Sequence, residues 1–146
     1  MTMMKVTKDG LAVKEDLGIL YLVHFELEGK ALVKIGVTTR TIEERVSEIL
    51  VSIFKKYREF PYCRPKRFRK TSDVYEKEAL LHKYFSTYKY DTQNKFSGST
   101  EFFDVPLEDV VKVYEALLKG KDIFYESRQI EDNDSGRGVC LPVGAD

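Results

Sequence analysis

Two apolar runs separated by a four-residue turn constrain the fold of this chain most strongly. The runs are GILYLVHFE (residues 18–26) and ALVKIGV (residues 31–37), and the turn LEGK joins them. Both runs contain β-branched and aromatic residues, which favour strands. The first run is apolar on both of its faces, so both faces must be covered. The sequence therefore predicts a β-hairpin whose first strand lies in the centre of a sheet.

A helix is predicted directly after the hairpin. Thr41 and Glu44 have the spacing of a capping box, and apolar residues then recur at helical intervals from Ile42 to Phe54. Arg45 stands beside this apolar stripe. Its guanidinium is therefore expected at the edge of the buried face of the helix.

The rest of the domain is predicted from weaker patterns. These give a short strand at 67–71, a second helix at 73–88, a brief closing strand at 100–105 and a third helix at 106–120. In the second helix, Asp73 and Glu76 have the spacing of another capping box, which gives Glu76 a structural role. Glu78 lies instead on the apolar stripe, where a carboxylate is costly to desolvate unless a cation or donors meet it. It is a candidate metal ligand, the alternative being a helix-edge glutamate paired with a nearby lysine.

Length and composition describe an ordinary globular domain. The chain has 146 residues, of which 42% are hydrophobic and 33% charged, and no apolar run is long enough to cross a bilayer. We expect a polar lead-in at 1–16, one domain at 17–120 and an acidic, flexible tail at 121–146. Cys63 and Cys140 form no C-x-x-C pair, so neither a disulfide framework nor a zinc site is predicted. A cytoplasmic protein without membrane association is expected.

Positive charge is concentrated in one block, although the formal net charge is zero. Residues 55–70 hold eight lysines and arginines against one acidic residue, Glu59, with tyrosine, phenylalanine and proline between them. Cations interleaved with aromatic residues suit a nucleic-acid surface, and a solvated loop is the alternative. The candidate DNA contacts are Lys55, Lys56, Arg64, Lys66, Arg67, Arg69 and Lys70.

Four motifs in order resemble a known family. GILYLV, VKIGVTTRTIEER, YEKEALLHKYF and TEFFDV are similar to the phage T5 Orf172-like branch of the GIY-YIG nuclease superfamily. The resemblance implies a small α/β (α+β) domain with a three-stranded antiparallel sheet flanked by helices. It also implies hydrolysis of a DNA phosphodiester with one divalent ion, Mg²⁺ or Mn²⁺. DNA is thus the expected partner, and a phage-encoded protein acting in the cytoplasm of a bacterial host is compatible with the resemblance.

The resemblance assigns site residues by position. Tyr21 matches the tyrosine of the first family motif, Arg45 the helix arginine, and Glu78 the metal-binding glutamate. Lys34 occupies the place of the second motif tyrosine, which is a departure from the parent motif and leaves cleavage open. Additional candidate site residues are Gly36, Thr38, Arg40 and His82.

The chemistry of phosphodiester attack gives these side chains separate roles. The planar guanidinium of Arg45 can neutralise charge on the nonbridging oxygens, and Glu78 supplies the hard oxygen ligand that Mg²⁺ prefers. Tyr21 is the candidate base, with Lys34 assisting it or contacting phosphate. The first hypothesis is a metal-dependent DNA endonuclease or nickase. The alternatives are a catalytically inactive DNA-binding module of the same fold and a protein-interaction domain in which Glu78 and Arg45 form a structural ion pair.

Overall fold

A computed structural model describes residues 4–6, 12–14 and 17–125 of the chain. The main domain contains β3 (Leu17–Leu27), β4 (Lys30–Thr38), α1 (Ile42–Tyr57), β5 (Tyr62–Ser72), α2 (Val74–Tyr84), β6 (Phe102–Phe103) and α3 (Leu107–Leu118). Two single 3₁₀ turns, η1 (Ser86–Tyr88) and η2 (Ser99–Glu101), lie between α2 and β6. In the lead-in, β1 (Met4–Val6) and β2 (Ala12–Lys14) form a separate antiparallel pair. The predicted tail lies outside the described residues from 126 onward.

The main sheet is antiparallel with the strand order β5-β3-β4-β6. The hairpin of β3 and β4 is confirmed, with β3 in the interior of the sheet as the sequence predicted. The sheet has four strands rather than three, because Phe102 and Phe103 pair with Lys34 and Val33 of β4. The strand expected at 67–71 is longer, and it pairs with β3 along almost the whole length of β3. The fold is thus mixed α/β, with a larger sheet than expected.

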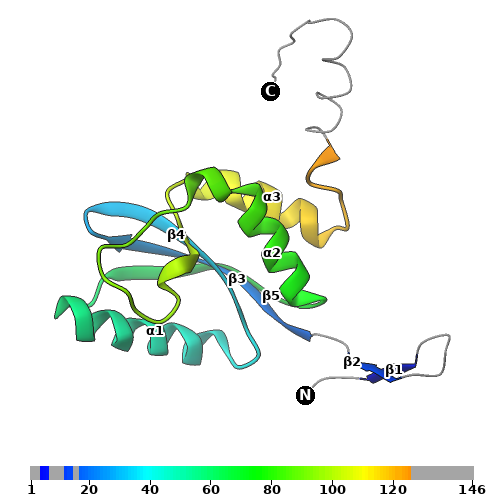
Figure 1. Cartoon of the computed structure of the whole chain (residues 1–146), viewed down its shortest axis with the longest axis horizontal. Coiled ribbons are helices and arrows are strands. Elements are labelled where there is room, and N and C mark those ends of the chain that lie inside the picture. Colours follow the sequence, from blue (N-terminus) through cyan, green and yellow to red (C-terminus); the bar gives the residue numbers. More distant parts are fainter. Residues whose placement is uncertain (1–3, 7–11, 15–16, 126–146) are drawn as a thin grey trace, which may run out of the picture.

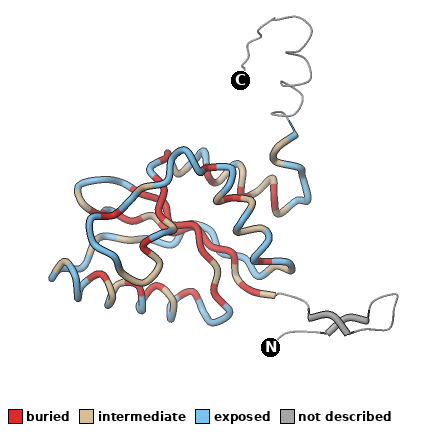
Figure 2. Tube along the Cα trace, in the orientation of Figure 1, coloured by how far each residue is buried: buried red, intermediate tan, exposed pale blue. Residues whose placement is uncertain are grey.

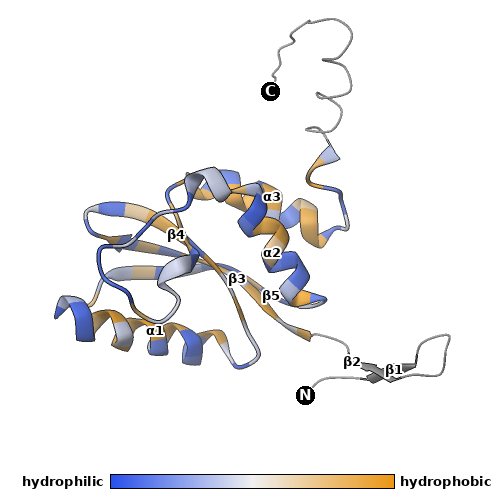
Figure 3. Cartoon of the chain, in the orientation of Figure 1, coloured by the Kyte–Doolittle hydropathy of each residue, from blue (hydrophilic) through white to orange (hydrophobic). Residues whose placement is uncertain are grey.

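Helices cover both faces of the sheet, α1 on one face and α2 with α3 on the other (Figure 1). Side chains of β3 alternate between the two layers, as the two-residue period of a strand requires. Leu20 and Leu22 pack with α2 and α3, whereas Tyr21, Val23 and Phe25 pack with α1. Figure 2 shows the resulting run of buried residues along β3, and Figure 3 shows that this run coincides with the most hydrophobic strands. The central hairpin therefore supplies the core of both layers.

One predicted capping box is confirmed and the other is wrong. At the start of α1, the Thr41 side chain accepts from Glu44 N at 3.1 Å, and the Glu44 carboxylate accepts from Thr41 N at 3.1 Å. Before α2, Asp73 makes no side-chain cap hydrogen bond. It is the single residue between β5 and α2 and adopts φ 50°, so its backbone makes the turn and is not in the extended conformation of a capping residue. Glu76 is consequently exposed and has no cap to support.

The tip of the hairpin is fastened to two other parts of the domain. Glu28 and Gly29 both have positive φ, as a two-residue hairpin turn requires. The Glu28 carboxylate accepts from Tyr90 Oη at 2.6 Å, from Gln93 N at 2.8 Å and from Tyr57 Oη. These contacts tie the tip to the end of α1 and to residues 90–93. They fix the start of the segment that runs back along α1 to η2.

Candidate functional site

The site begins with two polar side chains that β3 and β4 bury beneath α1. Tyr21 and Lys34 are both 0% exposed. Tyr21 stands directly opposite Gly36 in the strand register. A Cβ atom on Gly36 would lie 2.5 Å from Tyr21 Oη and 3.0 Å from Lys34 Nζ. The glycine thus leaves the space in which the phenol and the ammonium group meet.

Arg45 enters the same space from α1. Its side chain is 18% exposed, and its Nη1 donates to Ser97 Oγ at 3.1 Å and pairs with the Glu48 carboxylate. The guanidinium also lies beside the Tyr21 hydroxyl. Tyr21 Oη nevertheless has no partner in hydrogen-bonding geometry, and it is the one such buried side-chain atom in the described part of the chain. A buried polar atom without a partner is rare and points to a missing ligand or water.

Glu78 reaches the site from the opposite layer, around the edge of the sheet. β6 pairs with β4 only at Val33 and Lys34, and the His82 ring donates through Nε2 to the next carbonyl, Ile35 O, at 2.9 Å. His82 Nε2 lies 3.8 Å from Glu78 Oε2. Beyond Lys34 the edge of β4 is therefore open, in the sense that β6 does not pair with it, and α2 presents Glu78 at this point. His82 serves this edge as a backbone partner.

The charge balance around Glu78 shows which groups surround it. Its pKa is raised to about 7, first by burial and then by the neighbouring Glu101 carboxylate, while Lys34 and Arg45 act in the opposite direction. Glu78 thus lies near Lys34 and Arg45, the two cationic side chains that the sequence predicted for the site. The structure brings Tyr21, Lys34, Arg45 and Glu78 together.

Two residues of this cluster, Glu101 and Gly98, were not predicted from the sequence. Glu101, in η2, forms an ion pair with Lys34 Nζ. Gly98 has φ 81°, and a Cβ there would lie 2.8 Å from Lys34 Cε and 3.3 Å from Arg45 Nη2. Glu101 stands within the TEFFDV motif, directly before two buried phenylalanines, and no periodic pattern in the sequence marked it as a partner of Lys34.

Thr38 and Arg40 lie at the turn from β4 into α1. Thr38 is 6% exposed, and its Oγ1 accepts from Arg40 N at 3.1 Å, so its hydroxyl shapes the turn. The Arg40 side chain donates to Glu48 Oε1 at 2.9 Å. Arg40 and Arg45 are therefore joined through one carboxylate at the rim of the site.

The basic block is divided by the strand on which most of it lies. Arg67 and Arg69 pair with Leu22 and Leu20, whose side chains face α2 and α3, and Arg67 Nε donates to Glu115 of α3 at 3.0 Å. Lys70 pairs with Ile19 and belongs to the face that α1 covers. Lys55 and Lys56 lie in the last turn of α1. The structure does not gather these residues on one face.

Comparison with known families identifies the family of the chain. The model of the T5orf172 domain matches residues 18–118, from the start of β3 to the last residue of α3. The chain belongs to the T5orf172 domain family. No curated protein and no solved structure gives a significant match to it. Among the described helices of this T5orf172 domain, none is long and apolar enough to span a membrane.

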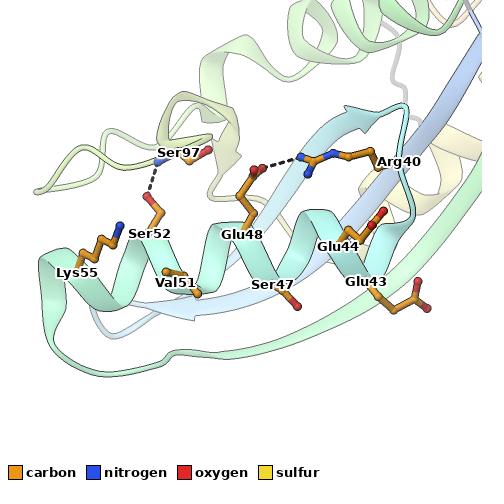
Figure 4. Close-up of a pocket in the computed structure, with 9 residues that line it drawn as sticks. All are labelled: Arg40, Glu43, Glu44, Ser47, Glu48, Val51, Ser52, Lys55 and Ser97. Atoms are coloured by element: carbon orange, nitrogen blue, oxygen red, sulfur yellow. Dashed lines mark hydrogen bonds and ion pairs between the residues drawn. The ribbon is translucent and has the colours of Figure 1, made fainter.

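A shallow surface groove adjoins the site without containing it. It runs along the outer side of α1 and is closed by Ser97, whose N donates to Ser52 Oγ at 2.8 Å (Figure 4). The groove is lined by Arg40, Glu43, Glu44, Ser47, Glu48, Val51, Ser52, Lys55 and Ser97. Three of these are glutamates, and an acidic wall does not favour a phosphate backbone. The buried cluster behind Arg45 is the better candidate for chemistry.

The side chains present can hold a hard divalent ion with water completing its shell. In the described ranges, no group of three or more His, Cys, Asp and Glu side chains could enclose a metal. Mg²⁺ does not need such a group, because it keeps several waters and binds through one or two carboxylates together with substrate phosphates. Glu78 is 17% exposed and can meet such an ion at the surface of the cluster. The T5orf172 domain therefore fits Mg²⁺ or Mn²⁺ better than it fits zinc.

Proposed function

We propose that this T5orf172 domain is a metal-dependent DNA endonuclease or nickase with a GIY-YIG-like site. T5orf172 domains are of a nuclease-associated, DNA-binding type, which makes DNA the expected partner. The observation that carries the proposal is the meeting of Tyr21, Lys34, Arg45 and Glu78. These side chains come from two strands and two helices, on opposite faces of the sheet. Packing alone gives no reason for four polar groups to gather in one place.

Arg45 is the residue that we propose binds the phosphate group of the DNA backbone. Its guanidinium is held by Glu48 and Ser97, so its position is fixed before any substrate arrives. A preorganised cation costs no reorganisation when charge develops on the nonbridging oxygens. Arg45 therefore acts on the transition state more than on ground-state binding.

Tyr21 is the proposed proton acceptor for the attacking water. Its hydroxyl lies beside the guanidinium of Arg45 and near the ammonium group of Lys34. The hydroxyl has no hydrogen-bond partner among the described residues, so it is not committed to a structural contact. Lys34 assists Tyr21 in this role by holding a positive charge close to it within the core.

Glu78 is the proposed ligand of Mg²⁺ or Mn²⁺. When bound, such an ion would supply Lewis-acid stabilisation of the phosphate oxygens. The protein's own contribution is to hold one carboxylate within reach of Arg45, with His82 packed against it. DNA approach is assigned to Lys55, Lys56 and Lys70 on the α1 side of the sheet. Arg64, Lys66, Arg67 and Arg69 lie on the side of α2 and α3 and are not assigned to it.

A second candidate function is a DNA-binding module without catalysis. It is favoured by the complete burial of Tyr21 and Lys34, because a base must reach the water that it activates. In that case the cluster is a structural charge network. DNA binding would persist and cleavage would be absent.

Nicking of a supercoiled plasmid with and without Mg²⁺ tests the proposal. Glu78→Gln removes the carboxylate charge with little change in shape, and it should abolish nicking while retaining DNA binding. Glu76→Gln on the same helix is the matched control, because Glu76 is exposed and, two residues from Glu78, lies on another side of the helix. It should nick like the wild type. DNA binding without nicking by the wild type would favour the non-catalytic module. Equal nicking by both variants would show that Glu78 takes no part in the reaction.

A further inference from the structure

We propose that Glu101 is a second carboxylate ligand, which together with Glu78 binds one divalent cation at the open edge of β4. This inference rests on the proposed function only in supposing that the ion serves a nuclease. Binding of the ion itself can be measured without DNA. Glu101 thus joins the site as a binding residue that the sequence did not indicate.

The first support is the placement of the two carboxylates. Glu78 comes from α2 on one side of the sheet, and Glu101 comes from η2, next to the short strand β6. They are close enough for Glu101 to be the main charged neighbour that disfavours ionisation of Glu78. Their side chains are 17% and 27% exposed, so both reach solvent as well as each other. Two carboxylates that converge at a surface are the ligand set that a hydrated Mg²⁺ or Mn²⁺ prefers.

The second support is Lys34, whose ammonium group is buried in the same place. A fully buried charge is tolerated only with a close partner, and Glu101 is that partner. The ammonium group occupies the position of a counter-cation between the carboxylates and the core. Lys34 therefore offsets part of the negative charge when no metal ion is bound.

The third support is independent of the acidic groups. Tyr21 Oη is completely buried and has no hydrogen-bond partner among the described residues. It faces the same small space over Gly36 as Lys34 Nζ. An unpartnered hydroxyl aimed at this space indicates a missing oxygen or water, as in the hydration shell of a bound ion.

The test is Mn²⁺ binding without DNA, measured by electron paramagnetic resonance of the free ion and by titration calorimetry. The decisive comparison is Lys34→Met against Lys34→Met/Glu101→Gln, because neither variant leaves a buried ammonium group without its partner. We expect the double variant to bind Mn²⁺ about tenfold more weakly, or worse, since one charged ligand is lost. Glu78→Gln should weaken binding similarly. Asp104→Asn, an exposed carboxylate three residues from Glu101, should not change it.

Melting temperatures without metal establish that the compared variants are folded. If Lys34→Met does not fold, Glu101→Gln is compared with the wild type instead, and its melting temperature shows whether the fold tolerates a Lys34 ammonium group without its partner. Equal Mn²⁺ affinity with and without Glu101 would overturn the proposal and leave Glu101 as an anchor for Lys34. Failure of the wild type to bind millimolar Mn²⁺ would overturn it as well. Binding that depends on both glutamates, in a protein that does not nick DNA, would support this inference and contradict the proposed function.

Discussion

Gly36 and Tyr21 are cross-strand partners so close that any side chain at position 36 would collide with the phenol. A Cβ atom there would lie 2.5 Å from Tyr21 Oη and 2.6 Å from Tyr21 Cζ. Both residues are buried, and the tyrosine ring cannot move away without displacing the core under α1. The glycine is therefore required by the position of the hydroxyl.

Gly36→Ala should destabilise the domain by about 1–3 kcal/mol through overpacking. Urea denaturation measures the change in the free energy of unfolding. In a Tyr21→Phe background the contact with Oη is lost while the contact with Cζ remains. Gly36→Ala should then lower the free energy of unfolding by less. A Gly36→Ala protein as stable as the wild type would show that the ring can leave its place.

Arg45→Lys should lower the nicking rate by about 10²-fold or more with little loss of DNA affinity. The lysine keeps the charge but loses the fork that Ser97 and Glu48 hold in place, and geometry matters most in the transition state. Single-turnover nicking and fluorescence anisotropy separate the two quantities. Arg40→Lys, which alters the other partner of Glu48, is the control. An unchanged rate for Arg45→Lys would count against the phosphate role.

Lys70→Ala and Arg69→Ala should differ in their effect on DNA binding, although the residues are neighbours. Lys70 lies on the α1 face and lines a small cavity with Arg40 and Thr38, whereas Arg69 faces α2 and α3. Loss of Lys70 should weaken binding to all sequences and reduce the salt slope by about one unit. Anisotropy titrations at several salt concentrations give this slope. Equal slopes for the two variants would place DNA elsewhere.

Glu78 should make the metal-free protein less stable as pH rises from about 4.5 to about 7. The pKa of Glu78 is raised to about 7 by burial and by Glu101, against 4.5 for the ordinary group. Within this window the folded carboxyl keeps a proton that the unfolded chain has lost, so the folded state binds more protons and loses stability, by at most about 1.4 kcal/mol per pH unit. Urea denaturation with EDTA at several pH values should give a flatter profile for Glu78→Gln. Parallel profiles for the two proteins would contradict the raised pKa.

Glu28→Gln should destabilise the hairpin tip by about 1 kcal/mol, because a charged acceptor of hydrogen bonds from Tyr57, Tyr90 and Gln93 is lost. Burial opposes ionisation, but these donors lower the pKa of Glu28 below 4.5. Its contribution is thus present at neutral pH and disappears as pH falls through the acid range. Thermal melting at pH 7 compares Glu28→Gln with Glu26→Gln, a substitution of an exposed neighbour. Equal melting temperatures for the two variants would show that Glu28 does not hold the hairpin tip in place.

The parts of the fold that sequence predicted are those fixed by local chemistry. The hairpin follows from its apolar runs and its turn, and α1 follows from Thr41, Glu44 and a regular stripe. The cap at Asp73 failed because a one-residue connection between β5 and α2 imposes its own backbone conformation. Local spacing could not reveal that constraint.

The site was only partly predictable for a similar reason. The family motifs supplied Tyr21, Lys34, Arg45 and Glu78, but the partner of Lys34 is 67 residues away along the chain. The division of the basic block depends on the register between β5 and β3, which shifts at a bulge next to Leu22. Neither the ion pair nor the bulge leaves a periodic pattern in the residues.

The meeting of side chains from both layers at the open edge of β4 also determines when the cluster can form during folding. Arg45 and Glu78 belong to helices on opposite faces of the sheet, and Glu101 arrives last along the chain. No fragment that ends before η2, and no intermediate with only one layer in place, can hold all three side chains together. If the cluster cuts DNA, the nascent or half-folded chain is harmless to the genome around it, and activity begins only with completion of the native state.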